Sequence, residues 1–229
     1  MEQRRTVRAV TAIAAQAPAP FAHRLCAAAE RGLGADGVGL AILGSDELLE
    51  PIAATPGGLD GEALQTDLGE GPSYVASREG RPVLVPDVDR DDTWPAFGPA
   101  ASKLGLRGVF AFPLRRGALH LGALTVYRDL VGDLSDDEHA DGLVYARLAF
   151  DVLSDPDRDN GVDGPLVGFD DDGIDTIEIH QASGVVSVQL GIDVAMALTM
   201  LRARAYADGR SLRELAADVV ARRLRLDDG

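Results

Sequence analysis

The chain has 229 residues and a formal net charge of −15, and 46% of its residues are hydrophobic. That hydrophobic content is enough to build a folded core, so the composition excludes a disordered chain in spite of the charge. The length fits one large domain or two smaller ones, because single domains commonly hold about 100–200 residues. The one cysteine, Cys26, excludes an intramolecular disulfide and a multi-cysteine metal site.

In the N-terminal stretch 1–18, Arg4, Arg5 and Arg8 precede an alanine-rich run over 9–17. This order imitates a secretion signal, but the run has no leucine cluster and is broken by Thr11. We therefore expect an amphipathic helix over 2–17. No stretch reaches the roughly 20 apolar residues of a membrane span, so we expect a cytoplasmic protein without membrane contact.

Apolar patterns between residues 19 and 153 predict a mixed domain. In chain order we expect a helix over 21–33, strands over 38–43 and 49–54, loops and short helices over 55–80, a strand over 82–85, a short helix within 91–104, strands over 108–114 and 119–127, and a helix over 135–153. Ser135 and Glu138 have the spacing of a capping box at the start of the last helix. Hairpins with helices to one side indicate an α+β domain with an antiparallel sheet.

Residues 154–173 differ in composition, because aspartates alternate with glycines. Such a stretch is typical of a solvated linker, and it separates 19–153 from a C-terminal domain over 174–229. That domain shows three amphipathic helical patterns punctuated by Gly191 and Gly209. A second capping box at Ser211 opens the third pattern. We expect a small all-α three-helix bundle.

Positive charge is concentrated in this bundle, because residues 179–226 contain seven arginines and only four acidic residues. Arginine supplies charge, a planar donor fork for phosphate and a surface that stacks on unpaired RNA bases. A solvated arginine face beside small residues that pack between helices would give the same pattern.

The C-terminal motifs resemble those of the ANTAR family of RNA-binding transcription antiterminators over about 178–226. The matching residues are Ala182 and Gly184 on the first helix, Ala197, Leu201, Arg202 and Ala205 on the second, and Leu212, Leu215, Ala216, Val219 and Val220 on the third. The resemblance implies that small and basic residues contact the loops of RNA hairpins. The residues that it assigns to RNA binding, with their basic neighbours, are Ala182, Ser183, Gly184, Arg202, Arg204, Arg210 and Arg213. Ser183 departs from the pattern, because the family has a basic residue between its alanine and glycine.

The segment 19–153 resembles a GAF sensor domain. The resemblance is carried by Gly69-Glu-Gly-Pro-Ser73, by the stretch 80–87 and by the hairpin strands around 110–113 and 121–124. It implies a small ligand held between the sheet and the helical segment. Candidate pocket residues are Tyr74, Trp94, Phe97, Arg107, Phe110 and Phe112, although ordinary core packing is the more common role of such aromatic residues. Many such domains have cysteine where Ser73 stands, so we do not expect thiol-based sensing.

Motifs for catalysis are missing from the sequence, which has no P-loop, no nucleophile elbow and no histidine pair at metal-ligand spacing. We predict no catalysis, no metal and no cofactor other than an unidentified small ligand of the sensor. The two resemblances, in this domain order, imply a ligand-responsive antitermination regulator, a homodimer that binds hairpins in nascent transcripts and blocks termination. The alternative is a signalling protein whose C-terminal helices serve dimerisation or partner docking. We also expect the acidic remainder of the chain to be able to cover the arginine face and silence it.

Overall fold

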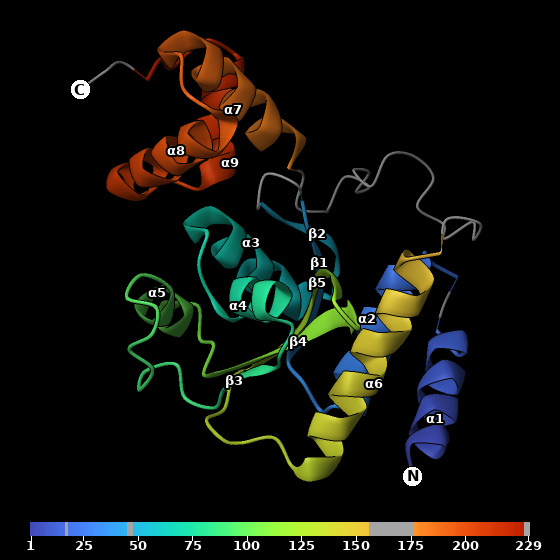
Figure 1. The fold of residues 1–229 in the computed structure, drawn as a ribbon. Coiled ribbons are helices and arrows are strands. Elements are labelled where there is room, and N and C mark those ends of the chain that lie inside the picture. The colour runs from blue at the N-terminus through green and yellow to red at the C-terminus, as the bar shows by residue number, and fades with distance from the viewer. Residues whose placement is uncertain (17, 45–47, 156–175, 227–229) are drawn as a thin grey trace.

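The computed structural model describes residues 1–16, 18–44, 48–155 and 176–226 (Figure 1). The described residues up to 155 form a domain around a β-sheet, which we name the sheet domain. Residues 176–226 form a separate group of helices, which we name the C-terminal bundle. Nearly all of the expected linker over 154–173 lies outside the described residues.

The strands of the sheet domain are all antiparallel to their neighbours, in the order β2-β1-β5-β4-β3. Their bounds are β1 Gly37–Leu43, β2 Leu49–Ala54, β3 Val83–Val85, β4 Gly108–Arg116 and β5 Leu119–Arg128. Each strand lies within two residues of its predicted position. The predicted antiparallel α+β fold is therefore confirmed.

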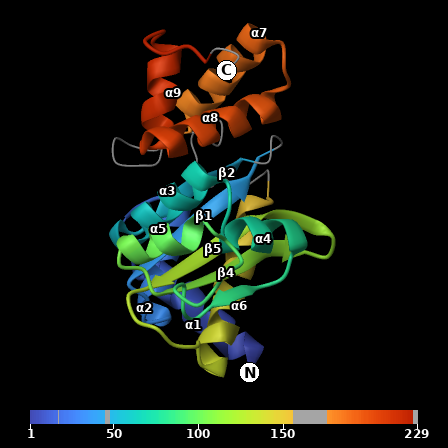
Figure 2. The same cartoon turned by 90° about the vertical axis from the view of Figure 1, so that its left-hand side faces the viewer.

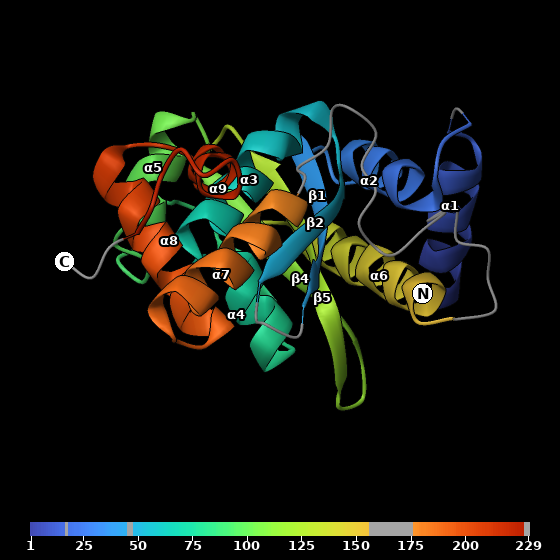
Figure 3. The ribbon, with the colours of Figure 1, turned by 90° about the horizontal axis from the view of Figure 1, so that it is seen from above.

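Helices cover both faces of the sheet, whereas the sequence indicated helices on one side. One face carries α2 (Phe21–Gly32) and α6 (Asp136–Leu153), with α1 (Glu2–Ala14) outside them. The other face carries a short 3₁₀ turn, Pro56–Gly58, and α3 (Leu59–Leu68), α4 (Pro72–Glu79) and α5 (Phe97–Lys103), as Figure 3 shows. The physical reason lies in β4, where Gly108–Leu114 are buried without alternation. Such a strand needs cover on both faces.

Charged side chains hold α1 against α6. Arg5 and Arg8 each donate to the carboxylate of Asp141, over 2.6 and 2.7 Å. Ala9 and Ile13 are buried on the same side of α1. The expected amphipathic helix is confirmed, although it ends at Ala14 and not at 17.

The C-terminal bundle consists, in its described part, of α7 (Ile177–Leu190), α8 (Val194–Asp208) and α9 (Leu212–Val220). Leucine, valine and alanine side chains from all three helices form its core. The predicted capping boxes at Ser135 and Ser211 are both present, and Gly191 and Gly209 end α7 and α8 in the left-handed conformation. The three-helix prediction is confirmed.

The bundle lies against the end of the sheet domain that carries β2 and α3 (Figures 1 and 2). Helix α3 contacts both α8 and α9. Leu48, just before β2, is fully buried and belongs to the core of the bundle. Within the described residues, no single helix is long and apolar enough to cross a membrane, although α7 and α8, bent by 106°, pass the same test as a pair.

Candidate nucleic-acid interface

The small residues assigned to RNA contact lie on α7. Ala182 is fully buried in the core of the bundle. Ser183 is 1% exposed, and its hydroxyl donates to the carbonyl oxygen of Ile179 over 2.8 Å. Gly184 is partly exposed, with open space beside its Cα. In this arrangement Gly184 is therefore the one of these three that a partner can approach closely.

Three of the candidate arginines lie at or near the outer surface of the bundle and pair with its own carboxylates. The pairs are Arg204 with Asp208 over 2.7 Å, Arg210 with Asp218 over 2.7 Å, and Arg213 with Glu178 over 3.5 Å. Pairs in contact with solvent contribute little free energy, because water and salt screen them. These guanidinium groups can therefore exchange a carboxylate for a phosphate at small cost.

Arg202 is placed differently, because its guanidinium lies against the sheet domain. Its Nη2 donates to the phenol oxygen of Tyr74 over 2.8 Å, and its Cζ lies 5.8 Å from the centroid of the Tyr74 ring. A Cβ on Gly69 would stand 2.5 Å from Nη1, so any larger residue there requires the guanidinium end of Arg202 to shift. Nε is buried and has no hydrogen-bond partner. The arginine that matches the ANTAR pattern is thus held at a contact between the domains.

A second contact joins α3 to the start of α9. Asp67 accepts a hydrogen bond from the backbone N–H of Leu212 over 3.1 Å, which places a carboxylate at the positive end of the helix. Burial raises the pKa of Asp67 to about 6, although this hydrogen bond and the nearby Arg202 oppose the rise. On α7, His180 Nε2 lies 3.0 Å from the carboxylate of Glu50 in β2.

Tyr206 is a surface aromatic residue that the sequence analysis did not single out. It follows Arg202 by four residues on α8, so the two share a face, and 69% of it is exposed. The available signal was its position, because an aromatic residue outside the apolar face of an amphipathic helix faces solvent. A flat exposed ring one turn from a guanidinium is suited to stacking on an unpaired base.

The six residues expected to line a ligand pocket do not come together. Trp94 and Phe97 meet edge to face, with centroids 6.3 Å apart, in the core beneath α5. Phe110 and Phe112 belong to the core on the opposite face of the sheet. Arg107 forms an ion pair at the surface, and the tyrosine contacts the C-terminal bundle as described above.

Polar side chains occupy the space between the sheet and α3–α4, where the resemblance placed a ligand. We name this group the polar cluster; its members, all buried, are Glu62, Gln65, Ser73, Thr125 and Tyr127. The phenol of Tyr127 donates to Glu62 over 2.7 Å, and the Gln65 amide donates to Ser73 and Tyr127, each over 2.8 Å. The hydroxyls of Ser73 and Thr125 are 2.6 Å apart. The cluster ties both helices to β5.

Glu62 is the ionisable carboxyl group of the polar cluster. Its burial raises the pKa of its carboxyl group to about 7, against the hydrogen bonds from Tyr127 and Thr125. Its Oε2 is buried without a hydrogen-bond partner. A Cβ on Gly39 of β1 would overlap the Glu62 side chain, so the glycine makes room for the acid. A carboxyl group with one unsatisfied oxygen is sensitive to any change in its surroundings.

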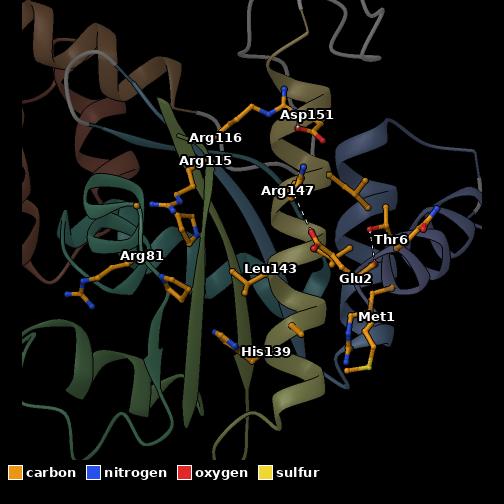
Figure 4. A pocket seen from close by; sticks show the side chains of 18 of the residues that line it. Met1, Glu2, Thr6, Arg81, Arg115, Arg116, His139, Leu143, Arg147 and Asp151 are labelled. Carbon is orange, nitrogen blue, oxygen red and sulfur yellow. Dashed lines mark hydrogen bonds and ion pairs between the residues drawn. The ribbon is translucent and has the colours of Figure 1, made fainter. Parts of the chain in front are cut away.

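A groove of 1440 Å³ lies on the α6 face of the sheet domain, between α1, α6 and the β4–β5 hairpin (Figure 4). Its cationic side chains are largely neutralised. Arg116 pairs with Asp151 over 2.8 Å, and Arg147 points toward Glu2 at 3.3 Å. No residue that the sequence analysis assigned to a ligand or to RNA lines this groove.

The described residues thus form an antiparallel sheet domain and a helical bundle that are joined through defined side-chain contacts. The chain belongs to the GAF domain family: the model of the GAF domain matches residues 15–143, and that of the ANTAR domain matches residues 176–220. This confirms the two-domain arrangement that the motifs indicated. The matched domains are of regulatory and sensory types.

Solved structures support the assignment of the fold. The GAF domain of a phosphoenolpyruvate-protein phosphotransferase from Coxiella burnetii is 18% identical, with a TM-score of 0.52 over 67% of this chain and 92% of that one. The corresponding domain from Acinetobacter is 12% identical, with a TM-score of 0.51 over 67% and 93%. Similarity at this level of identity shows a shared fold. No curated protein sequence matches the chain.

Proposed function

We propose that this protein binds hairpin RNA in nascent transcripts through α8 and α9 and thereby controls transcription termination in the cytoplasm. The observation that carries the proposal is that Arg202 and Tyr206 lie one turn apart on the same face of α8 in an ANTAR-type bundle. Loop bases splay out of an RNA hairpin, so an exposed ring can stack on one while arginines hold the neighbouring phosphates. The surplus of arginine in the bundle supports the same assignment.

The sheet domain would act as the sensor of a small molecule, and two chains would act together. A ligand that enters between the sheet and α3–α4 must displace or rearrange the polar cluster, because those side chains fill the space. Two bundles in one homodimer would engage two hairpins of the same transcript, which raises the effective affinity without new contacts.

Tyr206 provides the direct test of RNA binding. The probe is a labelled pool of RNA hairpins with one fixed stem and randomised loops, and the comparison pool holds the same loop sequences as single strands. We expect the hairpins to bind more tightly, and Tyr206→Ala to lower the affinity by about 5- to 150-fold, since stacking contributes about 1–3 kcal/mol. Tyr206→Phe keeps the ring and serves as the control. Equal binding of both pools, or no effect of Tyr206→Ala, would refute the proposal.

Apolar side chains at the α7–α8 corner favour a second candidate, dimerisation or partner docking by the bundle. Val188 is 85% exposed, and Val194 and Met196 are 42% and 50% exposed. An exposed apolar patch marks an interaction surface more often than isolated side chains do. If the bundle serves only this role, Val188→Asp will change the mass measured by sedimentation equilibrium while the wild-type protein shows no preference for hairpin RNA.

A further inference from the structure

We propose that the sheet domain and hairpin RNA compete for Arg202, so that the arrangement seen here is a closed state in which RNA binding is suppressed. This inference rests on the function proposed above. It assigns the suppression to one contact, the α3–α4 turn with Gly69 and Tyr74, and not to the general negative charge of the domain.

Tyr74 occupies the parts of Arg202 that RNA would use. Its phenol oxygen accepts a hydrogen bond from Nη2, and the centroid of its ring is 5.8 Å from Cζ, within the range of a cation–π contact. An RNA loop would need the same N–H groups for a phosphate and the same flat surface for a base. The two partners therefore exclude one another at this side chain.

The contact with the sheet domain leaves the positive charge and one N–H group of Arg202 without a matching partner. Nε of Arg202 is buried without a partner, and the acceptor at Nη2 is a neutral phenol. Among the described residues no carboxylate forms an ion pair with this arginine; Asp67 acts on it only from a greater distance. A phosphate offers a charge-assisted, two-pronged contact in place of a single neutral one. RNA can therefore displace the sheet domain once it reaches the arginine.

Helix α3 connects this contact to the interior of the sheet domain. Glu62 and Gln65 face the polar cluster, while Asp67 and Gly69, within the next turn, face the bundle. A shift of α3 that follows a change in the polar cluster would move both contacts at once. The closed state is thus coupled to the place where a ligand would act.

Gly69→Ala is the decisive variant, because the new Cβ would stand against the guanidinium of Arg202. Gly69 also has φ +67°, so alanine adds backbone strain there. Gly34→Ala is the matched control: Gly34 has φ +55° and nothing lies within 4 Å of the position of its Cβ. Tyr74→Phe is a second variant, since it removes the oxygen that accepts from both Arg202 and the Leu49 N–H.

The experiment uses the full chain and measures the radius of gyration by small-angle X-ray scattering together with affinity for the hairpin pool. We expect Gly69→Ala and Tyr74→Phe to enlarge the molecule and to bind RNA about tenfold more tightly, while Gly34→Ala behaves as the wild type. If the wild type binds the hairpin pool and the opened variants bind it no more tightly, the inference is overturned but the proposed function stands. Opened variants that bind no RNA overturn the function and the inference with it. Variants that stay closed overturn the role of this contact.

Discussion

Asp67 of the sheet domain completes the cap of a helix in the other domain, through its 3.1 Å hydrogen bond from the Leu212 N–H. The helix's own cap, Ser211, accepts from the Glu214 N–H, also over 3.1 Å, and so leaves the first N–H of α9 for an outside acceptor. Separation of the domains takes this acceptor away. The first N–H of α9 therefore has its carboxylate acceptor only while the two domains are in contact.

The titration of Asp67 predicts that docking depends on pH. Its pKa rises from the usual 3.8 to about 6 in the docked arrangement, mainly through burial, with Glu214 raising it further and Arg202 opposing. The docked form therefore binds a proton more readily than the open form between these values. We expect docking to strengthen as the pH falls from 7.5 to 5, with a smaller radius of gyration by X-ray scattering.

Asp67→Asn is the control for this titration, because the amide can still accept from Leu212 but does not ionise. His180, which contacts Glu50 across the same boundary, is replaced by glutamine in both proteins so that its imidazole adds nothing to the response. The Asn variant should show the same radius at both pH values. An equal pH response in the two proteins would place the titrating group elsewhere.

Glu62 predicts a separate effect of pH on the stability of the sheet domain. Burial raises its pKa from 4.5 to about 7, so the folded protein holds a proton that the unfolded chain releases between these values. Stability is therefore lost as the pH rises through this window. Glu62→Gln lacks the titration and should be more stable than the wild type at pH 8, by about 3 kcal/mol at most. Urea denaturation at pH 5 and pH 8 measures this, and a difference that does not change with pH contradicts it.

The close packing of Gly39 against Glu62 predicts that substitutions at these two positions affect stability together. A methyl group at this position overlaps the Glu62 side chain, so Gly39→Ala should lower the free energy of unfolding by about 1–3 kcal/mol. Glu62→Ala frees that space, and the double variant should recover part of the loss. Gly184→Ala, with open space around it, is the control and should cost nothing. Strictly additive losses in the double variant would show that the two positions do not touch.

Local patterns were sufficient to predict the elements of this fold. The strands, both capping boxes and the three helices of the bundle depend on neighbouring residues, and all of them are confirmed. Local patterns do not show which helices cover each face of a sheet when both faces are buried. The sequence therefore suggested Phe110 and Phe112 as pocket residues, but both lie on the other side of the sheet from α3 and α4.

Contacts between distant segments were beyond the sequence. Arg202 and Tyr74 are 128 positions apart, and nothing near either residue indicates the other. The polar cluster was missed for a similar reason, since Glu62 and Gln65 lie in a stretch that was interpreted as loop and short helices. Their meeting with Tyr127 depends on the packing of α3 across β5. That the acidic remainder of the chain silences the arginine face stays a prediction, since Arg202 meets the neutral phenol of Tyr74 in this arrangement.

Ser183 predicts how this chain differs from its family. The family pattern has a cation here, but Ser183 is 1% exposed and its hydroxyl is bonded to its own helix. Lysine cannot remain charged and buried at this position without a partner, so Ser183→Lys should force a rearrangement of α7 that weakens the closed state. We expect a larger radius of gyration and tighter binding of the hairpin pool.

Gln189→Lys separates this rearrangement from the effect of charge. It adds the same cation to the same helix at an exposed position, so it should strengthen RNA binding slightly through attraction alone and leave the radius of gyration unchanged. Raising the salt concentration should remove the gain in RNA affinity of Gln189→Lys and only part of the gain of Ser183→Lys, because opening does not depend on screening. If both lysine variants gain the same RNA affinity and both gains disappear at high salt, the buried Ser183 has no part in the closed state.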